Sequence, residues 1–363
     1  MRVLLDGQSF RQRRGGISRY FASLLAEFRS HPELGIEAIT PFRYVNNDFL
    51  LDLDPVRYKR PWVSDSSVSL MAFTILNQMR PRRSVHPEIV HHTGYSAKYL
   101  RVGEGVRRVS TVHDMIPELF PHYFGRSNPH LDKQKFVESS DAVLCVSEST
   151  RKDLLRIFGP PRGEVFVTPL GVSPRFSPHA TKPRWTPEEY LLFVGHRQGY
   201  KGFPTLLNAF SRVARHHTEL QLVCVGGTPF DAEEVAAIDG SGLANRLSQQ
   251  VVDDAELPGL YASARAFVFP SLYEGFGLPV LEAFACGCPA LLADIPCFRE
   301  VADEAALFFP ASDPTALADL IEHILVDQVL RAATVRRGLL RAKVFPWHRT
   351  ARLTAEAYGE ILQ

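Results

Sequence analysis

The chain contains two successive series of strand-like runs that alternate with helix-like segments. In the first series, short runs rich in β-branched residues lie at 2–6, 36–40, 88–93, 108–113, 141–147 and 165–170. Apolar residues have helical spacing at 16–28 and 149–159. Several runs are apolar almost throughout, which is typical of parallel strands covered on both faces. The pattern predicts a doubly wound α/β sheet.

The second series begins after a proline-rich break at 171–189, which has no apolar period. Its strand-like runs lie at 190–195, 220–227, 265–270, 289–293 and 306–309, and its helix-like segments at 203–216 and 315–325. A chain of 363 residues is too long for one ordinary core. We therefore predict two Rossmann-like domains and a final amphipathic helix: domain one at 1–175, a linker at 176–189, domain two at 190–345, and the helix within 346–363.

Composition excludes several classes of protein. The 41 basic and 40 acidic residues nearly cancel, which argues against a general nucleic-acid binder. The sequence contains no run of about 18 apolar residues, the length that a membrane-spanning helix needs. The first residues lack the features of a signal peptide. Cys145 and Cys224 lie in apolar runs, and Cys286 and Cys288 have no zinc-like partners. We expect a cytoplasmic protein with reduced thiols.

The segment 43–87 fits the alternation least well. It combines an apolar stretch at 68–79 with basic residues that include Arg57, Lys59, Arg60, Arg80, Arg82 and Arg83. One interpretation is an irregular insertion with a solvated basic rim. The other is an element that binds an acceptor or the surface of an anionic membrane, which favours basic residues beside an apolar helix.

Two glutamates enclose a tight turn in the second series. Glu274 and Glu282 lie in PSLYEGFGLPVLEAFACGCPAL, residues 270–291. A proline suits the first turn of a helix and a glycine suits the position after its end, so the sequence predicts a short helix at 279–286. The preceding loop then lies at the carboxyl end of a strand, where open α/β sheets bind ligands.

The chemistry of this loop and helix favours a nucleotide sugar. Glycine-rich loops and helix N-termini bind phosphate, whereas carboxylates repel it and accept hydrogen bonds from hydroxyl groups. A ligand with a phosphate flanked by hydroxylated rings would suit both the phosphate-binding loop and the two carboxylates. Glu282 could instead be an ordinary glutamate near a helix start, where the helix dipole favours negative charge.

The sequence EGFGLPVLE at 274–282 resembles the E-x7-E signature of the retaining nucleotide-sugar glycosyltransferases of family four. Further stretches resemble members that act as mannosyl- or rhamnosyltransferases of surface polysaccharides. These are GGISRYFASLL (15–25), TVHDMIPELFP (111–121), VSESTRKDL (146–154), VTPLGVSPRF (167–176), LLFVGHRQGYKGFPTLLNAF (191–210), FREVADEAALFF (298–309) and PWHRTARLTAEAY (346–358). The resemblance implies the GT-B fold: two Rossmann-like domains that face each other across a cleft, with the final helix crossing back to the first.

The resemblance also implies residue roles in donor binding. Glu274 would contact the donor sugar and Glu282 the ribose, with Gly275, Phe276, Gly277 and Leu278 forming the loop between them. Lys201 matches the family's lysine on the donor diphosphate. The family's arginine usually follows the strand glycine directly, but here Gly195 is followed by His196 and then Arg197. We assign Arg197 to the diphosphate and retain His196 as the alternative.

In the N-terminal half, the resemblance places His113 opposite the donor sugar, although a histidine next to Asp114 could also simply end a strand. Gly15 and Gly16 would let backbone amides approach the diphosphate or acceptor, or could form an ordinary turn. Two cations on the diphosphate would replace a divalent metal. We therefore predict no metal and no cofactor, and we interpret Asp253 and Asp254 as N-cap residues.

The predicted activity is retaining transfer of a hexose from a nucleotide sugar to a saccharide or lipid-linked saccharide, with peripheral contact at the inner membrane face as a hypothesis. GDP-mannose is favoured as donor, and UDP- or dTDP-sugars are alternatives. Two other functions stay open: transfer to a small-molecule or natural-product acceptor, and nucleotide-sugar epimerisation on the same fold. A nicotinamide dehydrogenase is excluded, because no G-x-G-x-x-G follows a strand.

Overall fold

The computed structural model describes residues 1–40, 42–60, 86–124, 128, 130–197 and 199–363. The chain forms two compact units. Unit 1 contains Met1–Leu170 together with Trp347–Gln363, and unit 2 contains Gly171–Pro346. The division therefore falls five residues before the end of the first predicted domain at 175.

Unit 1 is built on a six-stranded parallel sheet with the order β2-β1-β3-β4-β5-β6. The strands are β1 (Arg2–Leu5), β2 (Glu37–Ile39), β3 (Ile89–His92), β4 (Arg107–Val112), β5 (Ala142–Cys145) and β6 (Glu164–Val167). The helices are α1 (Gly16–Ser30), α2 (Asp48–Leu53), α4 (Ile116–Leu119), α5 (Lys133–Ser139), α6 (Glu148–Phe158) and α14 (Trp347–Glu360). All six predicted strands are present, because the apolar runs supply strands such as β3 and β5 that are buried on both faces.

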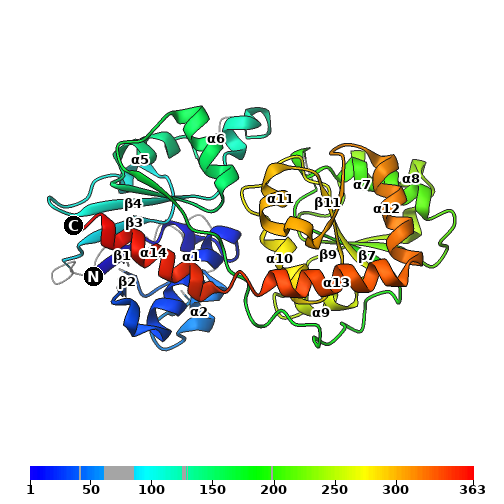
Figure 1. The fold of residues 1–363 in the computed structure, drawn as a ribbon, viewed down its shortest axis with the longest axis horizontal. Helices are drawn as coiled ribbons and strands as arrows, with labels where there is room; N and C mark the ends of the chain where they lie inside the picture. The colour runs from blue at the N-terminus through cyan, green and yellow to red at the C-terminus, as the bar shows by residue number, and fades with distance from the viewer. Residues whose placement is uncertain (41, 61–85, 125–127, 129, 198) are drawn as a thin grey trace. The chain divides into compact units, whose positions relative to one another are not determined.

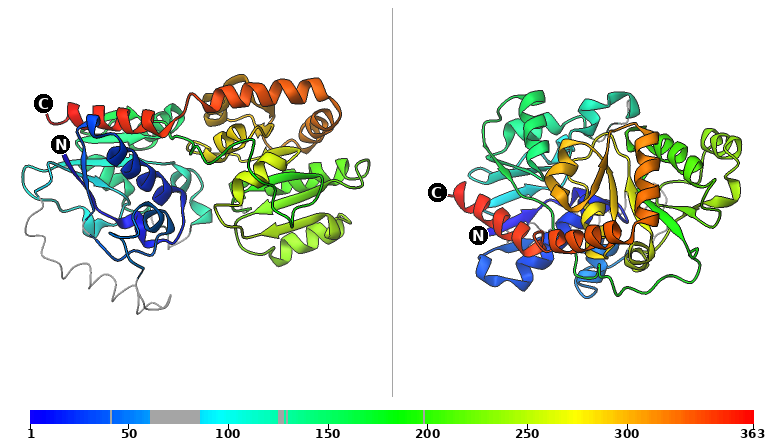
Figure 2. Two further views of the ribbon diagram at one scale, coloured as in Figure 1. Left: turned by 90° about the horizontal axis from the view of Figure 1, so that it is seen from below. Right: turned by 45° about the vertical axis from the view of Figure 1, so that its right-hand side comes forward.

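Helix α14 returns the end of the chain to unit 1 and lies beside α1 (Figures 1 and 2). The Tyr358 hydroxyl lies 2.6 Å from Nδ1 of His91 on β3, and both residues are fully buried. The Thr350 hydroxyl donates a hydrogen bond to the carbonyl of Pro169, and Trp347 packs near Tyr20 of α1. The predicted crossing of the final helix is thus confirmed, and its buried aromatic face explains it.

Unit 2 contains a second six-stranded parallel sheet, with the order β12-β11-β10-β7-β8-β9. Its strands are β7 (Tyr190–Val194), β8 (Gln221–Val225), β9 (Leu247–Gln250), β10 (Ala266–Phe269), β11 (Ala290–Ala293) and β12 (Leu307–Phe309). Its helices are α7 (Phe203–Val213), α8 (Ala232–Gly240), α9 (Leu257–Ser263), α10 (Leu278–Ala285), α11 (Pro296–Ala302), α12 (Pro314–Val326) and α13 (Gln328–Ala342). The doubly wound architecture of both units agrees with the predicted fold class.

The segment predicted as an interdomain linker belongs to unit 2. Phe176 is buried against Tyr261 of α9. Thr181 approaches Gly259 of α9 so closely that a Cβ on this glycine would lie 2.0 Å from the Thr181 carbonyl oxygen. The prediction of a linker at 176–189 was therefore wrong, because prolines removed the apolar period without removing the packing.

The irregular segment 43–87 is described only in part. Arg57, Lys59 and Arg60 are exposed, and Tyr44 forms an isolated parallel bridge with Lys59. The apolar stretch 68–79 and the basic residues Arg80, Arg82 and Arg83 lie outside the described residues. In the described part of the chain, no helix has both the length and the hydropathy to cross a membrane.

Candidate active site

The loop between β10 and α10 presents the first of the two glutamates. Strand β10 ends at Phe269, and α10 begins at Leu278 with Pro279 in its first turn. Gly277 caps the helix with a φ of +88°, and a Cβ there would lie 2.9 Å from the Phe298 ring. The predicted helix is thus confirmed with a shift of one residue. The loop residues Glu274, Gly275 and Phe276 follow the carboxyl end of the central strand β10.

Glu274 forms an ion pair with Lys201. The Lys201 Nζ lies 2.6 Å from the Glu274 Oε1, and the two side chains are 14% and 11% exposed. Lys201 ends a 3-10 turn at Gly199–Lys201, which follows β7. The next residue, Gly202, has a φ of +68°, and a Cβ there would lie 2.1 Å from the Pro270 carbonyl oxygen. Glycine thereby brings the loops after β7 and β10 into contact.

Glu282 lies in the interior of α10 and is 3% exposed. The Tyr261 hydroxyl of α9 donates a 3.2 Å hydrogen bond to its Oε2. A buried carboxylate needs hydrogen-bond donors, and Tyr261 supplies one of them. The role of Glu282 toward a ribose stays a prediction.

Arg197 is buried, and its guanidinium binds groups of unit 2. Its Nε and Nη2 donate to the Glu234 carboxylate at 2.9 and 3.1 Å, and its Nη2 also donates to the Thr228 carbonyl at 2.7 Å. The guanidinium lies 4.6 Å from the centroid of the Phe230 ring. This set of bonds fixes the loops after β7 and β8 to each other and balances the charge of Arg197 inside the protein.

His196, the alternative cation, is exposed. Its pKa is lowered from the ordinary value by partial burial and then by the positive charges of Lys201 and Arg197. These two cations therefore influence His196 directly. A bound diphosphate would offset their charge and favour the protonated imidazole.

His113 directly follows β4 in unit 1, as predicted. Burial lowers its pKa to about 4, so the imidazole is neutral at pH 7. Its Nε2 is buried and has no hydrogen-bond partner among the described residues, and its ring lies edge-on to Tyr20 at a centroid distance of 5.0 Å. A buried ring nitrogen without a partner is costly unless a ligand or water satisfies it.

Gly15 and Gly16 begin α1, with Gly15 as its N-cap. The φ of Gly15 is 176°, an extended conformation open to any residue, so the backbone does not require glycine here. Apart from its chain neighbours and the backbone of its own helix, a Cβ at Gly16 would meet no described atom within 4 Å. The start of this helix is therefore open, with or without glycine, which agrees with the approach of a ligand.

Comparisons with known proteins identify the family. The model of glycosyltransferase family 4 matches residues 14–176, and the model of glycosyl transferases group 1 matches residues 179–340. The chain is a GT-B glycosyltransferase of the family-four type. It is a hexosyltransferase that resembles bacterial mannosyltransferases.

The most informative relatives come from Escherichia coli. The O-antigen chain mannosyltransferase B is 29% identical over 266 residues, which are 69% of this chain and 70% of that protein. The serotype-specific mannosyltransferase WbdA is 26% identical over 279 residues, which are 71% of this chain but only 34% of WbdA. Among solved structures, the sucrose-phosphate synthase from Thermosynechococcus elongatus has a TM-score of 0.73 at 19% identity, covering 100% of this chain and 99% of that one.

Several contacts in this glycosyltransferase were not predicted from its sequence. Glu234, the partner of Arg197, also completes a capping box with Asp231 at the start of α8. The D-x-x-E spacing before a helix was the available signal. Tyr261 gave no signal, because an apolar aromatic position predicts core packing.

The prediction that Asp253 and Asp254 are N-cap residues was wrong. The N-cap of α9 is Glu256, and Asp254 pairs with Arg175 at 2.9 Å.

Unit 1 of the glycosyltransferase holds a buried lysine near His113 that the sequence did not indicate. Lys133 of α5 is 1% exposed, and its ammonium donates to the Asp114 carbonyl at 2.9 Å and to the Glu118 carboxylate at 2.8 Å. The ion pair fixes the loop after β4, which begins with His113. Lysine at the start of a short helix normally predicts a solvated side chain.

The competing roles of His196 and Arg197 can be separated by substitution. We expect His196→Ala to weaken nucleoside-diphosphate binding about tenfold, the effect of losing one hydrogen bond to a charged group, with little change in Tm. Arg197→Ala should mainly lower Tm, because it leaves Glu234 unpaired. Calorimetric titration of both variants below their Tm measures the affinity for the nucleoside diphosphate, and thermal unfolding measures the change in Tm. Unchanged affinity in His196→Ala, with lost affinity in folded Arg197→Ala, would restore the diphosphate role to Arg197.

Proposed function

We propose that this glycosyltransferase transfers a mannose-like hexose from a nucleotide sugar, with GDP-mannose favoured, to a saccharide or lipid-linked saccharide. The names of the relatives support this donor sugar and an acceptor that belongs to a polysaccharide. Their matches extend over about 70% of the chain, and the family models match both units.

The ion pair between Lys201 and Glu274 is the observation that carries the proposal. The Lys201 ammonium is suited to bind a phosphate, and the Glu274 carboxylate is suited to bind sugar hydroxyls. The two groups lie at hydrogen-bond distance from each other. When the donor binds, its diphosphate becomes a second partner for Lys201. Glu274 can then accept hydrogen bonds from the hexose. The pair thus keeps both groups in position before the donor arrives, which is the preorganisation that electrostatic catalysis requires.

The proposed reaction retains the anomeric configuration. The bond between the anomeric carbon and the diphosphate oxygen breaks, and the acceptor oxygen bonds to the same face of that carbon. The acceptor proton passes to the leaving diphosphate, whose negative charge Lys201 stabilises. His113, neutral at pH 7, would serve as a hydrogen-bonding group for the sugar and not as a cation. The role of His113 rests on the family resemblance.

A ligand screen tests the donor. GDP, UDP and dTDP, each alone and as its hexose, are compared by thermal shift; a ligand at one hundred times its Kd stabilises the fold by about 2.7 kcal/mol. We expect GDP-mannose to give the largest shift. NMR of the product from a synthetic mannosyl acceptor then reports its anomeric configuration. A shift with UDP- or dTDP-sugars alone would reject GDP-mannose, and an inverted product would reject retention.

Transfer should persist in EDTA. We expect kcat to fall less than twofold after exhaustive chelation. The reason is that Lys201, together with Arg197 or His196, stabilises the leaving diphosphate. The rate is measured with and without added Mg²⁺ or Mn²⁺ at one temperature well below the Tm of the chelated protein. Loss of transfer that either ion restores would contradict the prediction.

We propose that the acceptor binds unit 1, because the predicted donor residues lie mainly in unit 2. For a lipid-linked acceptor, the basic residues of 43–87 would contact an anionic leaflet, each contributing about 1 kcal/mol. Co-sedimentation with phosphatidylglycerol vesicles at low and high salt measures this contact. We expect pelleting at low salt that high salt reverses. A protein that stays in the supernatant and turns over a water-soluble acceptor efficiently would reject membrane contact.

A further inference from the structure

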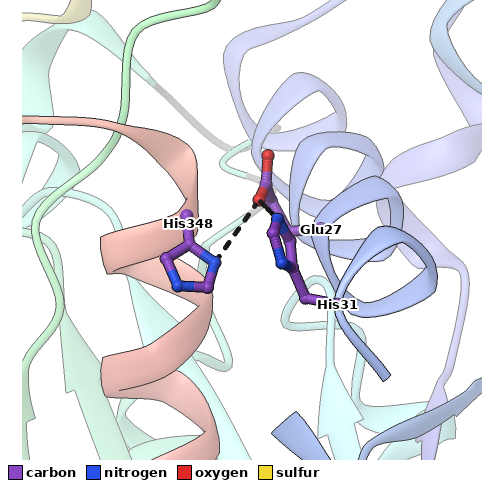
Figure 3. A group of neighbouring side chains, drawn as sticks. All are labelled: Glu27, His31 and His348. Carbon is purple, nitrogen blue, oxygen red and sulfur yellow. Dashed lines mark ion pairs between the residues drawn. The ribbon is translucent and has the colours of Figure 1, made fainter. Parts of the chain in front are cut away.

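A group of three possible metal ligands lies in unit 1 and includes none of the predicted donor residues. Glu27 and His31 are one helical turn apart at the end of α1, and His348 lies in the first turn of α14 (Figure 3). One ligand atom from each residue lies within 4.8 Å of the other two. Since residues four apart share a helix face, Glu27 and His31 both face α14.

The distances approach those of a coordination shell. The His31 Nε2 lies 3.4 Å from the Glu27 Oε2, and the His348 Nδ1 lies 4.0 Å from the same oxygen. Two ligands of a tetrahedral Zn²⁺, each 2.0–2.1 Å from the ion, are about 3.3 Å apart. The first distance already fits, and a small rotation of the His348 ring would close the second.

The hydrogen bonds around the group point to a ligand. Glu33 accepts a 2.8 Å hydrogen bond from the His31 Nδ1, and the His31 Nε2 faces Glu27 on the other side of the ring. A carboxylate on the second ring nitrogen is the arrangement that orients metal-binding histidines. The buried His348 Nδ1 has no hydrogen-bond partner among the described residues. One carboxylate oxygen and two imidazole nitrogens thus converge, and a cation could bind all three.

We propose that Glu27, His31 and His348 bind a divalent transition-metal ion, for which Zn²⁺ is the best fit, with Glu33 as the outer carboxylate. Two imidazoles and one carboxylate suit Zn²⁺, whereas Mg²⁺ and Ca²⁺ require oxygen ligands. The three side chains are partly exposed, so solvent reaches the ion and supplies the fourth ligand. His348 is the second residue after the boundary between the units. The ion therefore fastens the first turn of α14 to α1.

A metal titration tests the site. Tag-free, chelator-treated full-length protein is titrated with ZnCl₂ by calorimetry, and Tm is followed in parallel. We expect one saturable site and a Tm increase that saturates with it. The five cysteines are buried in the fold and do not compete. Co²⁺ in place of Zn²⁺ should give the visible absorption of a tetrahedral or five-coordinate ion. Wild-type protein without saturable binding would overturn the proposal.

Matched variants distinguish a metal site from an ordinary ion pair. His31→Gln and His348→Gln should abolish the saturable site, and Glu33→Gln should weaken it about 10–100-fold, because Glu33 orients the His31 ring without touching the ion. His217→Gln is the control, because His217 pairs with Glu322 at 2.6 Å in unit 2, outside any such three-residue group of the described chain. Zn²⁺ affinity should also fall on acidification, because protons compete with a metal ion for its ligands. Equal Zn²⁺ affinity in wild type and His348→Gln would overturn the proposal.

The site and the proposed transferase function fail independently. Removing Zn²⁺ should lower Tm while transfer, measured well below that Tm, persists. Transfer that requires the metal would reject the metal-independent mechanism and leave the binding site in place. Absence of Zn²⁺ binding with intact transfer would reject only the site.

Discussion

Replacing Lys201 by alanine should lower kcat for sugar transfer by about 100-fold to 1000-fold. Removing one preorganised group that stabilises a developing anion raises the barrier by about 2.7–4 kcal/mol. The Lys201 side chain is only 14% exposed and its ammonium already lies 2.6 Å from Glu274, so water replaces it poorly. Binding of the nucleoside diphosphate should weaken as well, because this product of the transfer carries the negative charge that Lys201 stabilises in the transition state. Steady-state kinetics and calorimetric titration of the diphosphate measure both effects.

Lys182→Ala is the matched control for this substitution. Lys182 also forms an ion pair in unit 2, with Glu188 at 3.0 Å, but Glu188 is 95% exposed, so the pair contributes little. We expect wild-type transfer from this variant. Lys201→Arg should recover part of the lost rate by retaining the charge. Wild-type kcat in a folded Lys201→Ala variant would refute the assignment of Lys201 to the leaving group.

Replacing Glu274 by glutamine should lower kcat by one to two orders of magnitude while nucleotide binding persists. A hydrogen bond to a charged group contributes about 1.5–3 kcal/mol, and the amide keeps the size of the side chain but loses its charge. Affinity for the nucleoside diphosphate alone should stay the same or increase, because Lys201 loses its competing carboxylate. The contrast between lost transfer and retained diphosphate affinity identifies a residue that serves the sugar.

Thermal unfolding must accompany the Glu274 measurement, because breaking a largely buried ion pair also destabilises the fold. Glu188→Gln is the control, since it neutralises a carboxylate of an exposed pair in the same unit. A double-mutant cycle with Lys201→Ala adds a second criterion: residues in contact should show effects that do not add. Wild-type transfer by Glu274→Gln would contradict the sugar-binding role.

The sequence predicted strands well where burial is two-sided. Strands such as β5 and β10 are fully buried, so their residues are apolar throughout and the pattern stands out. Strand β9, with the sequence LSQQ, was missed because it lies at the edge of its sheet and stays half-buried. Helix α13 was missed because it follows α12 after one residue, and its many arginines obscure the apolar spacing.

The candidate site was predictable where glycine and proline fix the backbone. The turn from β10 into α10 follows from Gly277, Pro279 and the preceding apolar strand. The pairing of Lys201 with Glu274 spans 73 residues, and no local pattern reports a contact between two loops. The same limitation applies to Arg197, which lies in the loop after β7, while its carboxylate partner Glu234 lies on α8 and is known only from the folded chain.

The division of unit 1 between both ends of the chain affects the order in which the protein folds during synthesis. Domains usually fold as units in the order in which they leave the ribosome. Here unit 2 is continuous, whereas the core of unit 1 lacks Trp347 and Tyr358 until residues 347–358 have been translated. Until then Tyr20 and His91 are without the partners that cover them in the native fold. Unit 2 can therefore complete its fold first. Part of the core of unit 1 stays exposed until α14 has been synthesised and packs onto it.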